Sequence, residues 1–213
     1  MNNYTSITGY RYDSAAHGHS HAYLLQPLEA ELDAIRKKDQ VRVWRLFELG
    51  CGNGSVAVHL SRKGWEVVGV DPSSDGIAQA NKAYPHLCLK SGSAYDDLAA
   101  TYGRFPVVIS LEVVEHVYAP RDYARTIFDI LEPGGVAIIS TPYHGYLKNF
   151  ALALTGKMDV HFTALWDHGH IKFWSIRTLQ QLLEEAGFTD IAFRRVGRIP
   201  PLAKSMIAVA RKS

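Results

Sequence analysis

Cysteine, long apolar runs and an excess of one charge are all scarce in this sequence. Only two cysteines, Cys51 and Cys88, occur among 213 residues. Because Cys51 lies in a glycine-rich segment where a disulfide would be awkward, we expect a reduced, cytoplasmic protein. No window approaches the roughly 18 apolar residues of a membrane span, and the first residues lack the basic start and apolar core of a signal peptide. The formal net charge of +2 is too small to suggest a nucleic-acid-binding surface, so we expect no nucleic-acid partner.

What is present is an ordinary globular composition, with 47% hydrophobic and 21% charged residues. A chain of this length suits one domain with a sizeable core. No repeat, low-complexity tract or Pro/Gly/Ser-rich linker divides it. We therefore expect a single domain over residues 41–213, preceded by an N-terminal cap segment and helix over residues 1–40.

Short apolar stretches alternate with amphipathic ones, a pattern typical of an α/β fold with a mainly parallel sheet covered on both faces. The expected strands are residues 43–49, 65–70, 86–90, 107–111, 136–140, 188–196 and 204–211. The expected helices are residues 23–38, 55–63, about 74–84, about 94–101, 120–131 and about 175–187. The last two strands are joined by a short connection without a helix, so they should pair antiparallel.

Residues 142–174 break this alternation. They hold seven aromatic residues and four histidines, and we interpret them as an insertion on the substrate side of the domain. The aromatic side chains suggest an apolar lid that accepts a ring. For each of them, packing of the insertion onto the sheet is an equally good explanation.

A glycine-rich turn follows the first expected strand, with the sequence ELGCGNG over residues 48–54. Its glycines let the backbone turn sharply and approach a ligand where a side chain would clash. Loops at the carboxyl ends of parallel strands open a crevice beside the point where the strand order reverses. Asp71 closes the second strand, 21 positions beyond Gly50, and an acid there can accept both hydroxyls of a ribose. The pattern favours an adenosine-containing ligand.

The carboxylate of Glu48 distinguishes between two such ligands. A dinucleotide site needs the spacing GxGxxG and places a pyrophosphate at the helix N-terminus. Here the spacing is GCGNG, and Glu48 stands just before it. A carboxylate repels a pyrophosphate and attracts an ammonium or sulfonium. The loop therefore suits a cationic ligand better than NAD, and an NAD-dependent oxidoreductase is disfavoured.

Five motifs resemble those of class I S-adenosylmethionine-dependent methyltransferases: ELGCGNG at 48–54, VDPS at 70–73, GSAYD at 92–96, LEVVEHV at 111–117 and LEPGG at 131–135. The agreement in order and spacing covers about residues 43–141, and the closing helix and hairpin extend it. The LEVVEHV stretch is most similar to the ubiquinone-biosynthesis O-methyltransferase branch. The resemblance implies a Rossmann-like seven-stranded sheet of order 3-2-1-4-5-7-6, with strand 7 antiparallel and helices on both faces. It also implies S-adenosyl-L-methionine as cofactor and S-adenosyl-L-homocysteine as product.

The resemblance further implies which residues contact the cofactor. They are Glu48 at the methionine ammonium, Gly50, Cys51 and Gly52 along the methionine portion, Asp71 at the ribose hydroxyls, Pro72, Ser93 and Ala94 around the adenine, and Glu112 near the methionine end. Ser93 stands where many relatives place an acid, which leaves the contact to the adenine amino group open.

Methyl transfer from a sulfonium is an in-line displacement, so the protein mainly aligns the nucleophile and excludes water. An oxygen nucleophile also benefits from a general base near neutral pH, which points to histidine. The candidates are His144, directly after the fifth strand, and His161. We rank His116, His168 and His170 below them. For any single histidine, a structural or solvent-exposed role is the more common one.

Glu112, Glu115 and His116 form an E-x-x-E-H stretch that has been associated with a divalent cation in the ubiquinone branch. Carboxylates and an imidazole can bind Mg²⁺ or Zn²⁺ and acidify a catechol. In many relatives the same segment only shapes the turn beside the cofactor, and we assign no metal. The Tyr- and His-rich residues 1–22 either cap the crevice or form a tail.

We expect an enzyme that methylates a small-molecule acceptor at oxygen. There is no separate substrate domain and no basic stripe for RNA or DNA. Residues 111–114 read LEVV instead of the (N/D)-P-P-(Y/F) tetrapeptide of many base N-methylases. The alternative is a catalytically silent S-adenosylmethionine-binding module or partner protein. The identity of the acceptor does not follow from the fold.

Overall fold

The computed structural model describes residues 21–39, 44–166 and 169–213. The strands are β1 (Arg45–Leu49), β2 (Glu66–Asp71), β3 (Cys88–Ser91), β4 (Phe105–Leu111), β5 (Leu131–Pro142), β6 (Phe188–Val196) and β7 (Ser205–Lys212). The helices are α1 (His21–Asp39), α2 (Ser55–Arg62), α3 (Ser74–Ala83), α4 (Leu98–Tyr102), α5 (Pro120–Ile130), α6 (Tyr146–Leu154), α7 (Met158–Phe162) and α8 (Ile176–Glu185), and a 3₁₀ turn, η1, spans Pro200–Leu202.

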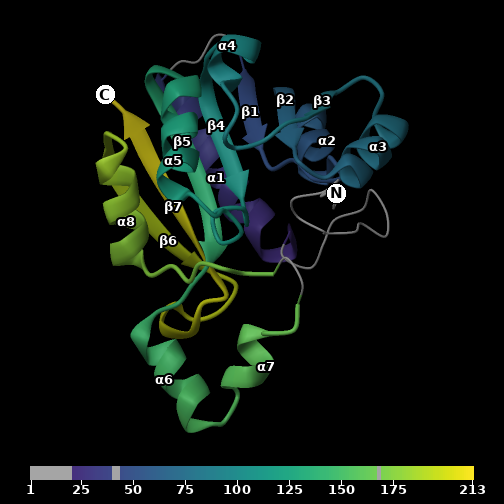
Figure 1. The fold of residues 1–213 in the computed structure, drawn as a ribbon. Coiled ribbons are helices and arrows are strands. Elements are labelled where there is room, and N and C mark those ends of the chain that lie inside the picture. The colour runs from purple at the N-terminus through teal and green to yellow at the C-terminus, as the bar shows by residue number, and fades with distance from the viewer. Residues whose placement is uncertain (1–20, 40–43, 167–168) are drawn as a thin grey trace.

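All seven strands form one sheet in the order β3-β2-β1-β4-β5-β7-β6. Neighbours from β3 to β5 pair in parallel, whereas β7 is antiparallel to both β5 and β6. This confirms the predicted order and the predicted direction of the seventh strand. The order reverses between β1 and β4 (Figure 1), and the helices that follow these strands, α2 and α5, pack on opposite faces of the sheet. In open α/β sheets, ligands bind beside the carboxyl ends of the strands at such a point.

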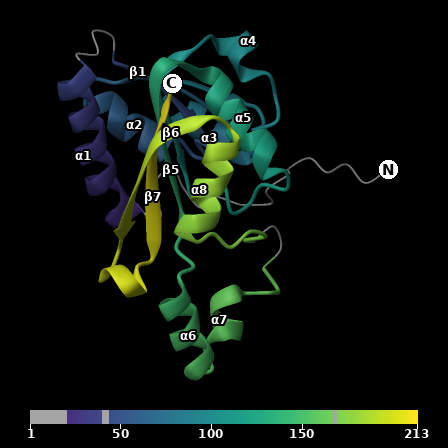
Figure 2. The same cartoon turned by 90° about the vertical axis from the view of Figure 1, so that its left-hand side faces the viewer.

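The helices pack on the two faces of the sheet in separate apolar clusters. On one face the buried side chains come from α1, α2 and α3, and on the other they come from α4, α5 and α8. Figure 2 shows α1 and α2 on one side of the sheet and α5 and α8 on the other. In α1, Leu24, Leu28 and Leu32 are almost completely buried, and each contributes roughly 1.5–3 kcal/mol by burial. Helix α1 is therefore an integral part of the core.

Helix α4 begins at Leu98, later than the expected start near residue 94. The preceding residues form a turn instead, in which the N–H of Asp96 donates to the carbonyl of Ser93 at 3.1 Å. The side chain of Asp97 accepts a hydrogen bond from the N–H of Ala100, and an Asp in this position is a strong helix N-cap. Asp97 is therefore the N-cap, and helix α4 starts after the turn.

Strand β5 begins at Leu131, five residues before the expected strand. Leu131 pairs with Phe105, and the register of β4 and β5 shifts between Phe105 and Val107. Irregular pairing of this kind tolerates Pro133, which lacks an N–H, and Gly134, which has a φ of 78°. Pro133, Gly134 and Gly135 therefore form a bulge within β5 and do not form a loop that precedes β5.

Residues 142–174 leave the sheet after β5 and carry α6 and α7, which project beyond it (Figures 1 and 2). Neither helix contributes a buried residue. The base of the segment is closed by a bridge between Tyr143 and Trp174, and Nε1 of Trp174 donates to the carbonyl of Val114 at 3.1 Å. None of the helices in the described ranges is long and apolar enough to cross a membrane.

Candidate active site

The glycine loop between β1 and α2 is held close to its neighbouring strands. The N–H groups of Gly50 and Cys51 donate to the carbonyl of Val70 at 2.8 and 3.0 Å. Gly54 caps α2 with a φ of 73°, a left-handed conformation that favours glycine. A Cβ added at Gly50 would overlap Cγ2 of Val113, so the loop backbone packs directly against the segment that follows β4.

Asp71, at the end of β2, anchors this loop. Its Oδ2 accepts from the N–H of Gly52 at 2.9 Å, and its Oδ1 accepts from the N–H of Ser73 at 2.8 Å. Burial raises the pKa of Asp71, and these two N–H bonds partly oppose the shift. Each carboxylate oxygen keeps a second lone pair, so the anchoring role is compatible with the expected contact to ribose hydroxyls. Pro72 follows directly and is partly buried.

Glu48 is a buried acid, and one oxygen of its side chain has no hydrogen-bond partner among the described residues. Glu48 is 3% exposed, and the oxygen concerned is Oε2. Burial, together with the negative charge of Asp71, raises the pKa of Glu48 well above its ordinary value. An ammonium group would supply both the charge and the donors that are lacking here. The residues present therefore fit the methionine end of S-adenosylmethionine.

The side chain of Cys51 faces the sheet. It is 4% exposed, and a Cβ added at Gly69 would lie 2.8 Å from the Cβ of Cys51. Burial, then the negative charges of Glu48 and Asp71, raise the pKa of the thiol well above its usual range. Any contact between Cys51 and the cofactor would thus come from its backbone.

The turn after β3 lies beside Asp71, because the N–H of Gly92 donates to the Asp71 carbonyl at 3.2 Å. Ser93 and Ala94 belong to this turn and are partly buried. Asp96 stabilises it, since its Oδ2 accepts from the N–H of Ser93 at 2.7 Å. The sequence analysis assigned no role to Asp96, although the GSAYD motif contains it. Asp96 places a carboxylate next to the position where Ser93 replaces the acid of many relatives.

Glu112, directly after β4, has a left-handed backbone with a φ of 55°, which is rare outside glycine and typical of functional sites. Its Oε1 accepts from Ser140 Oγ at 2.8 Å and its Oε2 from Ser205 Oγ at 3.1 Å. Ser205 Oγ also lies 3.2 Å from the hydroxyl of Tyr23. Burial raises the pKa of Glu112 to about 7, with the serine hydrogen bonds and the charge of Lys148 opposing the shift. Glu112 therefore joins α1, β4, β5 and β7 at one point.

A cavity of about 510 Å³ opens beside Glu112. It lies between the end of β5, the inserted α6 and α7, the connection between β6 and β7, and α1. The side chains that line it include Tyr23, Glu112, His144, Lys148, His161, His170, Phe173, Arg198 and Lys204. Its size is in the range of small-molecule sites.

The two histidines ranked first by the sequence analysis, His144 and His161, both line this cavity. Their ring centroids are 5.5 Å apart. Burial, followed by the positive charges of Lys148, His161 and His170, lowers the pKa of His144 to about 4. Burial and Lys148 also lower the pKa of His161. Nε2 of His161 is buried and has no hydrogen-bond partner among the described residues.

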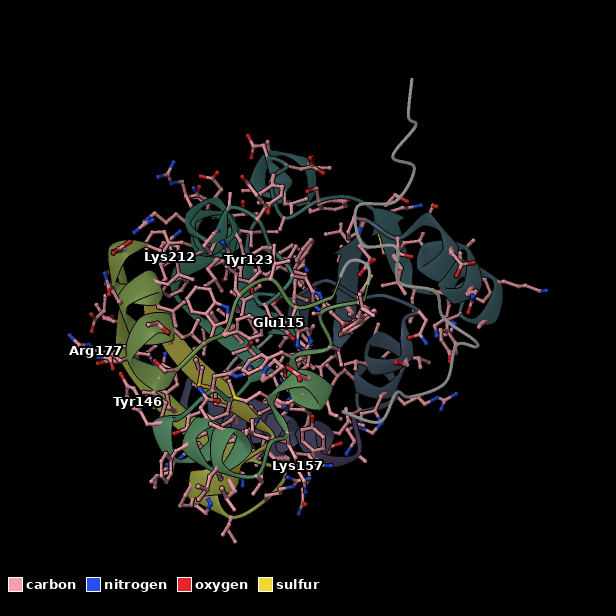
Figure 3. The ribbon with its side chains drawn as sticks, turned by 60° about the horizontal axis from the view of Figure 1, so that its bottom comes forward. Glu115, Tyr123, Tyr146, Lys157, Arg177 and Lys212 are labelled. Carbon is pink, nitrogen blue, oxygen red and sulfur yellow. The ribbon has the colours of Figure 1, made fainter. Side chains whose placement is uncertain are left out.

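Glu115, His116 and His170 form a second cluster next to the cavity. Their potential ligand atoms all lie within 4.8 Å of one another, and Oε1 of the buried Glu115 has no hydrogen-bond partner among the described residues. Figure 3 shows Glu115 in the interior of the molecule. The candidate metal-binding residues considered from the sequence were Glu112, Glu115 and His116, so that set contained Glu112 where the structure has His170. The structure groups His170 with the other two because the insertion returns beside the turn after β4, where N–H groups of Ile171 and Lys172 donate to the Glu115 carbonyl.

The expected residues thus fall into two groups. Those assigned to the cofactor from β1, β2 and β3 surround the glycine loop, whereas Glu112, His144 and His161 surround the cavity. Lys148, Arg198 and Lys204 were missed, because no motif marks them and they lie far apart in the sequence. Most of the Tyr- and His-rich N-terminal segment, residues 1–20, and His168 lie outside the described residues.

Comparison with known proteins identifies the family. A family model described as a methyltransferase domain matches residues 14–192. The chain is 31% identical over 174 residues to a ubiquinone biosynthesis O-methyltransferase of Cereibacter sphaeroides, and the alignment covers 79% of this chain and 70% of that protein. This chain belongs to the S-adenosylmethionine-dependent methyltransferase family. S-adenosylmethionine, which the resemblance implied, is therefore its cofactor, and a small-molecule acceptor is implied by the family.

Solved structures place the methyltransferase in the same fold. The magnesium protoporphyrin IX methyltransferase of Synechocystis PCC 6803, solved with S-adenosylhomocysteine bound, aligns with a TM-score of 0.64 at 18% identity over 88% of this chain and 83% of that one. A possible histamine N-methyltransferase of Thermotoga maritima aligns with a TM-score of 0.61 at 19% identity, over 87% of this chain and 89% of that one. At these identities the likeness concerns the fold alone.

Proposed function

We propose that this methyltransferase transfers the methyl group of S-adenosylmethionine to an oxygen atom of a small molecule that occupies the cavity beside Glu112. The observation that carries the proposal is the pair of imidazoles, His144 and His161, on the wall of a cavity at the carboxyl ends of β4 and β5. The name of the Cereibacter relative, an O-methyltransferase, favours oxygen as the acceptor atom.

The cofactor assignments made from the sequence are part of the proposal. The residues that would hold the cofactor are Glu48 at the ammonium, the backbone of Gly50, Cys51 and Gly52 along the methionine portion, Asp71 at the ribose, Pro72, Ser93 and Ala94 around the adenine, and Glu112 between the methionine end and the cavity. The unpartnered carboxylate of Glu48 and the lone pairs left on Asp71 support these assignments.

When bound, the cofactor supplies a methyl group that is already activated on a sulfonium. The residues of the chain then have to hold the acceptor oxygen in line, exclude water and remove its proton. His161 is suited to take that proton, because its side chain lines the cavity and its lowered pKa leaves the imidazole neutral at pH 7. His144 stays neutral for the same reason and provides an aromatic wall beside it.

We further propose that residues 142–174 act as the acceptor-side insertion of a single methyltransferase domain over residues 41–213, whose core is completed by α1. The insertion supplies Lys148 from α6 and His161 from α7 to the cavity, and Tyr23 reaches it from α1. The cavity is therefore built largely by segments that do not belong to the seven-stranded sheet. Such segments vary more than the elements of the sheet, as expected for a part of the protein that determines which acceptor binds.

Glu115, His116 and His170 are the described residues suited to hold a divalent cation, since two imidazoles and a carboxylate form a donor set that Zn²⁺ and related ions accept. A cation there would lower the pKa of an acceptor hydroxyl. Assays with and without EDTA therefore accompany the experiment below.

The test is S-adenosylhomocysteine formation at pH 7 with a panel of phenols and hydroxy acids, for the natural protein and for His161→Asn. Asn keeps the polarity of the side chain but cannot act as a base, so kcat should fall about 10²- to 10⁴-fold. Calorimetric affinity for S-adenosylhomocysteine should stay within about twofold, because His161 is not among the residues around the glycine loop.

His86→Asn serves as the control, because His86 is exposed on the connection between α3 and β3, away from the cavity. A His161→Asn variant with kcat close to that of the control would exclude His161 as the base. Binding of S-adenosylhomocysteine without turnover on any acceptor would instead favour the catalytically silent module.

A further inference from the structure

Three cations line the acceptor cavity: Lys148 from α6, Arg198 from the connection between β6 and β7, and Lys204 just before β7. No carboxylate of the described residues lies within ion-pairing distance of any of them. Lys148 is partly buried, whereas Arg198 and Lys204 are exposed at the edge of the cavity. The positive charge of the cavity is therefore not balanced by ion pairs among residues 21–39, 44–166 and 169–213.

Among the described residues that line the cavity, Glu112 is the single acid, and it is already engaged. Both of its oxygens accept hydrogen bonds from serine hydroxyls, and its raised pKa of about 7 keeps it partly protonated at neutral pH. Glu112 thus offsets at most a fraction of the charge contributed by Lys148, Arg198 and Lys204.

Lys148 is the most constrained of these cations. Its side chain is partly buried, and its Nζ donates to the carbonyl of Tyr143 at 2.8 Å, which leaves two of its three N–H groups for other acceptors. Burial, then the positive charge of Arg198, lower the pKa of Lys148, and Glu112 opposes the shift. A partly buried ammonium with free donors next to a guanidinium is a costly arrangement that an anionic ligand would stabilise.

The rest of the wall limits what kind of anion fits. Pro142, Leu152 and Phe173 are apolar or aromatic, and the ring of His144 lies against Phe173 with centroids 5.0 Å apart. Such a surface accepts a ring more readily than a sugar. The anion and the ring are therefore expected in one molecule.

We propose that the acceptor is an aromatic carboxylic acid bearing a hydroxyl group, with its carboxylate held by Lys148 and Arg198 and its hydroxyl directed toward His161. Only the placement of the hydroxyl rests on the proposed function. The contact between the carboxylate and the two cations concerns binding and does not depend on methyl transfer. A guanidinium and an ammonium on separate elements hold a carboxylate from two directions, which fixes the ring in the cavity and so orients the reacting oxygen.

The experiment compares 4-hydroxybenzoate with 4-hydroxybenzamide, which have nearly the same shape and differ in charge. Binding is measured by calorimetry on the full chain saturated with S-adenosylhomocysteine, so turnover is not required. The natural protein should bind the acid at least tenfold more tightly than the amide. Lys148→Gln and Arg198→Gln should each weaken binding of the acid at least fivefold and change binding of the amide less than twofold.

Two variants act as controls. Arg177→Gln removes an exposed guanidinium of α8 at the rim of the molecule (Figure 3) and should leave both affinities unchanged. Lys148→Arg keeps the charge and should keep the preference for the acid. Unchanged affinity of each variant for S-adenosylhomocysteine shows that the protein is folded.

The inference would be overturned if the protein bound 4-hydroxybenzoate no more tightly than the amide. It would also be overturned if neither compound bound. An equal loss of acid binding in Arg177→Gln would likewise overturn it. Charge-selective binding without methyl transfer to any phenol would leave this inference standing and refute the proposed oxygen transfer, so the two failures are distinguishable.

Discussion

Glu48 is a buried side chain whose surroundings lack the partners that a carboxylate needs. Removing a carboxylate from water costs several kcal/mol unless charge partners and hydrogen bonds replace the solvent. In the described structure, Oε2 of Glu48 has neither, and the nearby Asp71 adds negative charge. Such an arrangement is stable only because the rest of the core supports it, and the ammonium group proposed to bind there would supply the missing partner.

We therefore predict opposite effects of Glu48→Gln on ligand affinity and on stability. The substitution keeps the shape but removes the charge, so affinity for S-adenosylmethionine should fall at least tenfold, as expected from losing a hydrogen bond to a charged group worth about 1.5–3 kcal/mol. Without ligand, the variant should be at least as stable as the natural protein, because the desolvated carboxylate is gone. Calorimetric titration and urea unfolding at pH 7 measure the two quantities.

Glu132→Gln, at an exposed position of β5, is the control and should alter neither quantity. If Glu48→Gln lowered stability and affinity together, the carboxylate would have a structural role and the ammonium assignment would be wrong.

At the scale of elements, the glycine loop combines two constraints that experiments can separate. Gly50 has a φ of 86°, and a Cβ there would overlap Val113. Gly103 has a similar φ of 76° but no atom within 4 Å of an added Cβ. Substitution of Gly103 therefore measures backbone strain alone. Substitution of Gly50 measures backbone strain together with the close packing of the loop against the segment after β4.

Gly103→Ala should lower the free energy of unfolding by about 1–3 kcal/mol, because the φ of 76° and ψ of −162° at Gly103 lie in a region that is essentially restricted to glycine. Gly50→Ala should cost a further 1–3 kcal/mol or so from the overlap. Adding Val113→Ala to Gly50→Ala should recover part of that difference, which urea unfolding of the variants would measure. Equal losses for the two glycine variants would mean that the loop does not pack closely on Val113.

The elements that the sequence predicted well are those encoded locally. The alternation of strands and helices, the turn residues of 48–54 and the acid at Asp71 are short-range signals. They sufficed for a mainly parallel α/β sheet and for a cationic adenosine ligand, whereas the full strand order and S-adenosylmethionine followed from the resemblance to class I methyltransferases. The start of β5 was misplaced because Pro133 and Gly134 mark either a loop or a bulge, and only the pairing of Leu131 with Phe105 decides between them.

At the scale of the whole molecule, the cavity combines segments that no local pattern connects. Tyr23 comes from α1, Lys148 from α6, and Arg198 and Lys204 from the connection before β7. Each of these residues alone is an ordinary surface side chain by sequence. The sequence could name His144 and His161 because they lie in the unusual segment 142–174, but the charge around them depends on how distant segments pack. This is the physical reason why the donor was readable from the sequence and the acceptor was not.

The same assembly makes the stability of the molecule depend on pH through His144. Its pKa is about 4 in the folded protein, lowered by burial and by the positive charges of Lys148, His161 and His170, against about 6.5 in the unfolded chain. The unfolded state therefore binds more protons as the pH falls below 6.5, so the contribution of the neutral imidazole is complete above that pH and is lost toward pH 4. For a group with this pKa shift, the loss between pH 7 and pH 5 is about 1–2 kcal/mol.

His144→Phe should remove this dependence, because a phenyl ring has no proton to gain and fits the cluster that His144 forms with Phe162 and Phe173. Urea unfolding at pH 7 and pH 5 should show a decline about 1–2 kcal/mol smaller in this variant than in the natural protein. Other groups that titrate in this range, Glu112 among them, remain in both proteins and cancel in the comparison. His86→Phe, at an exposed position, should follow the natural protein. If His144→Phe also followed it, the imidazole would already be accessible to protons in the folded state, and the cavity wall would be open to water where the proposed reaction needs it dry.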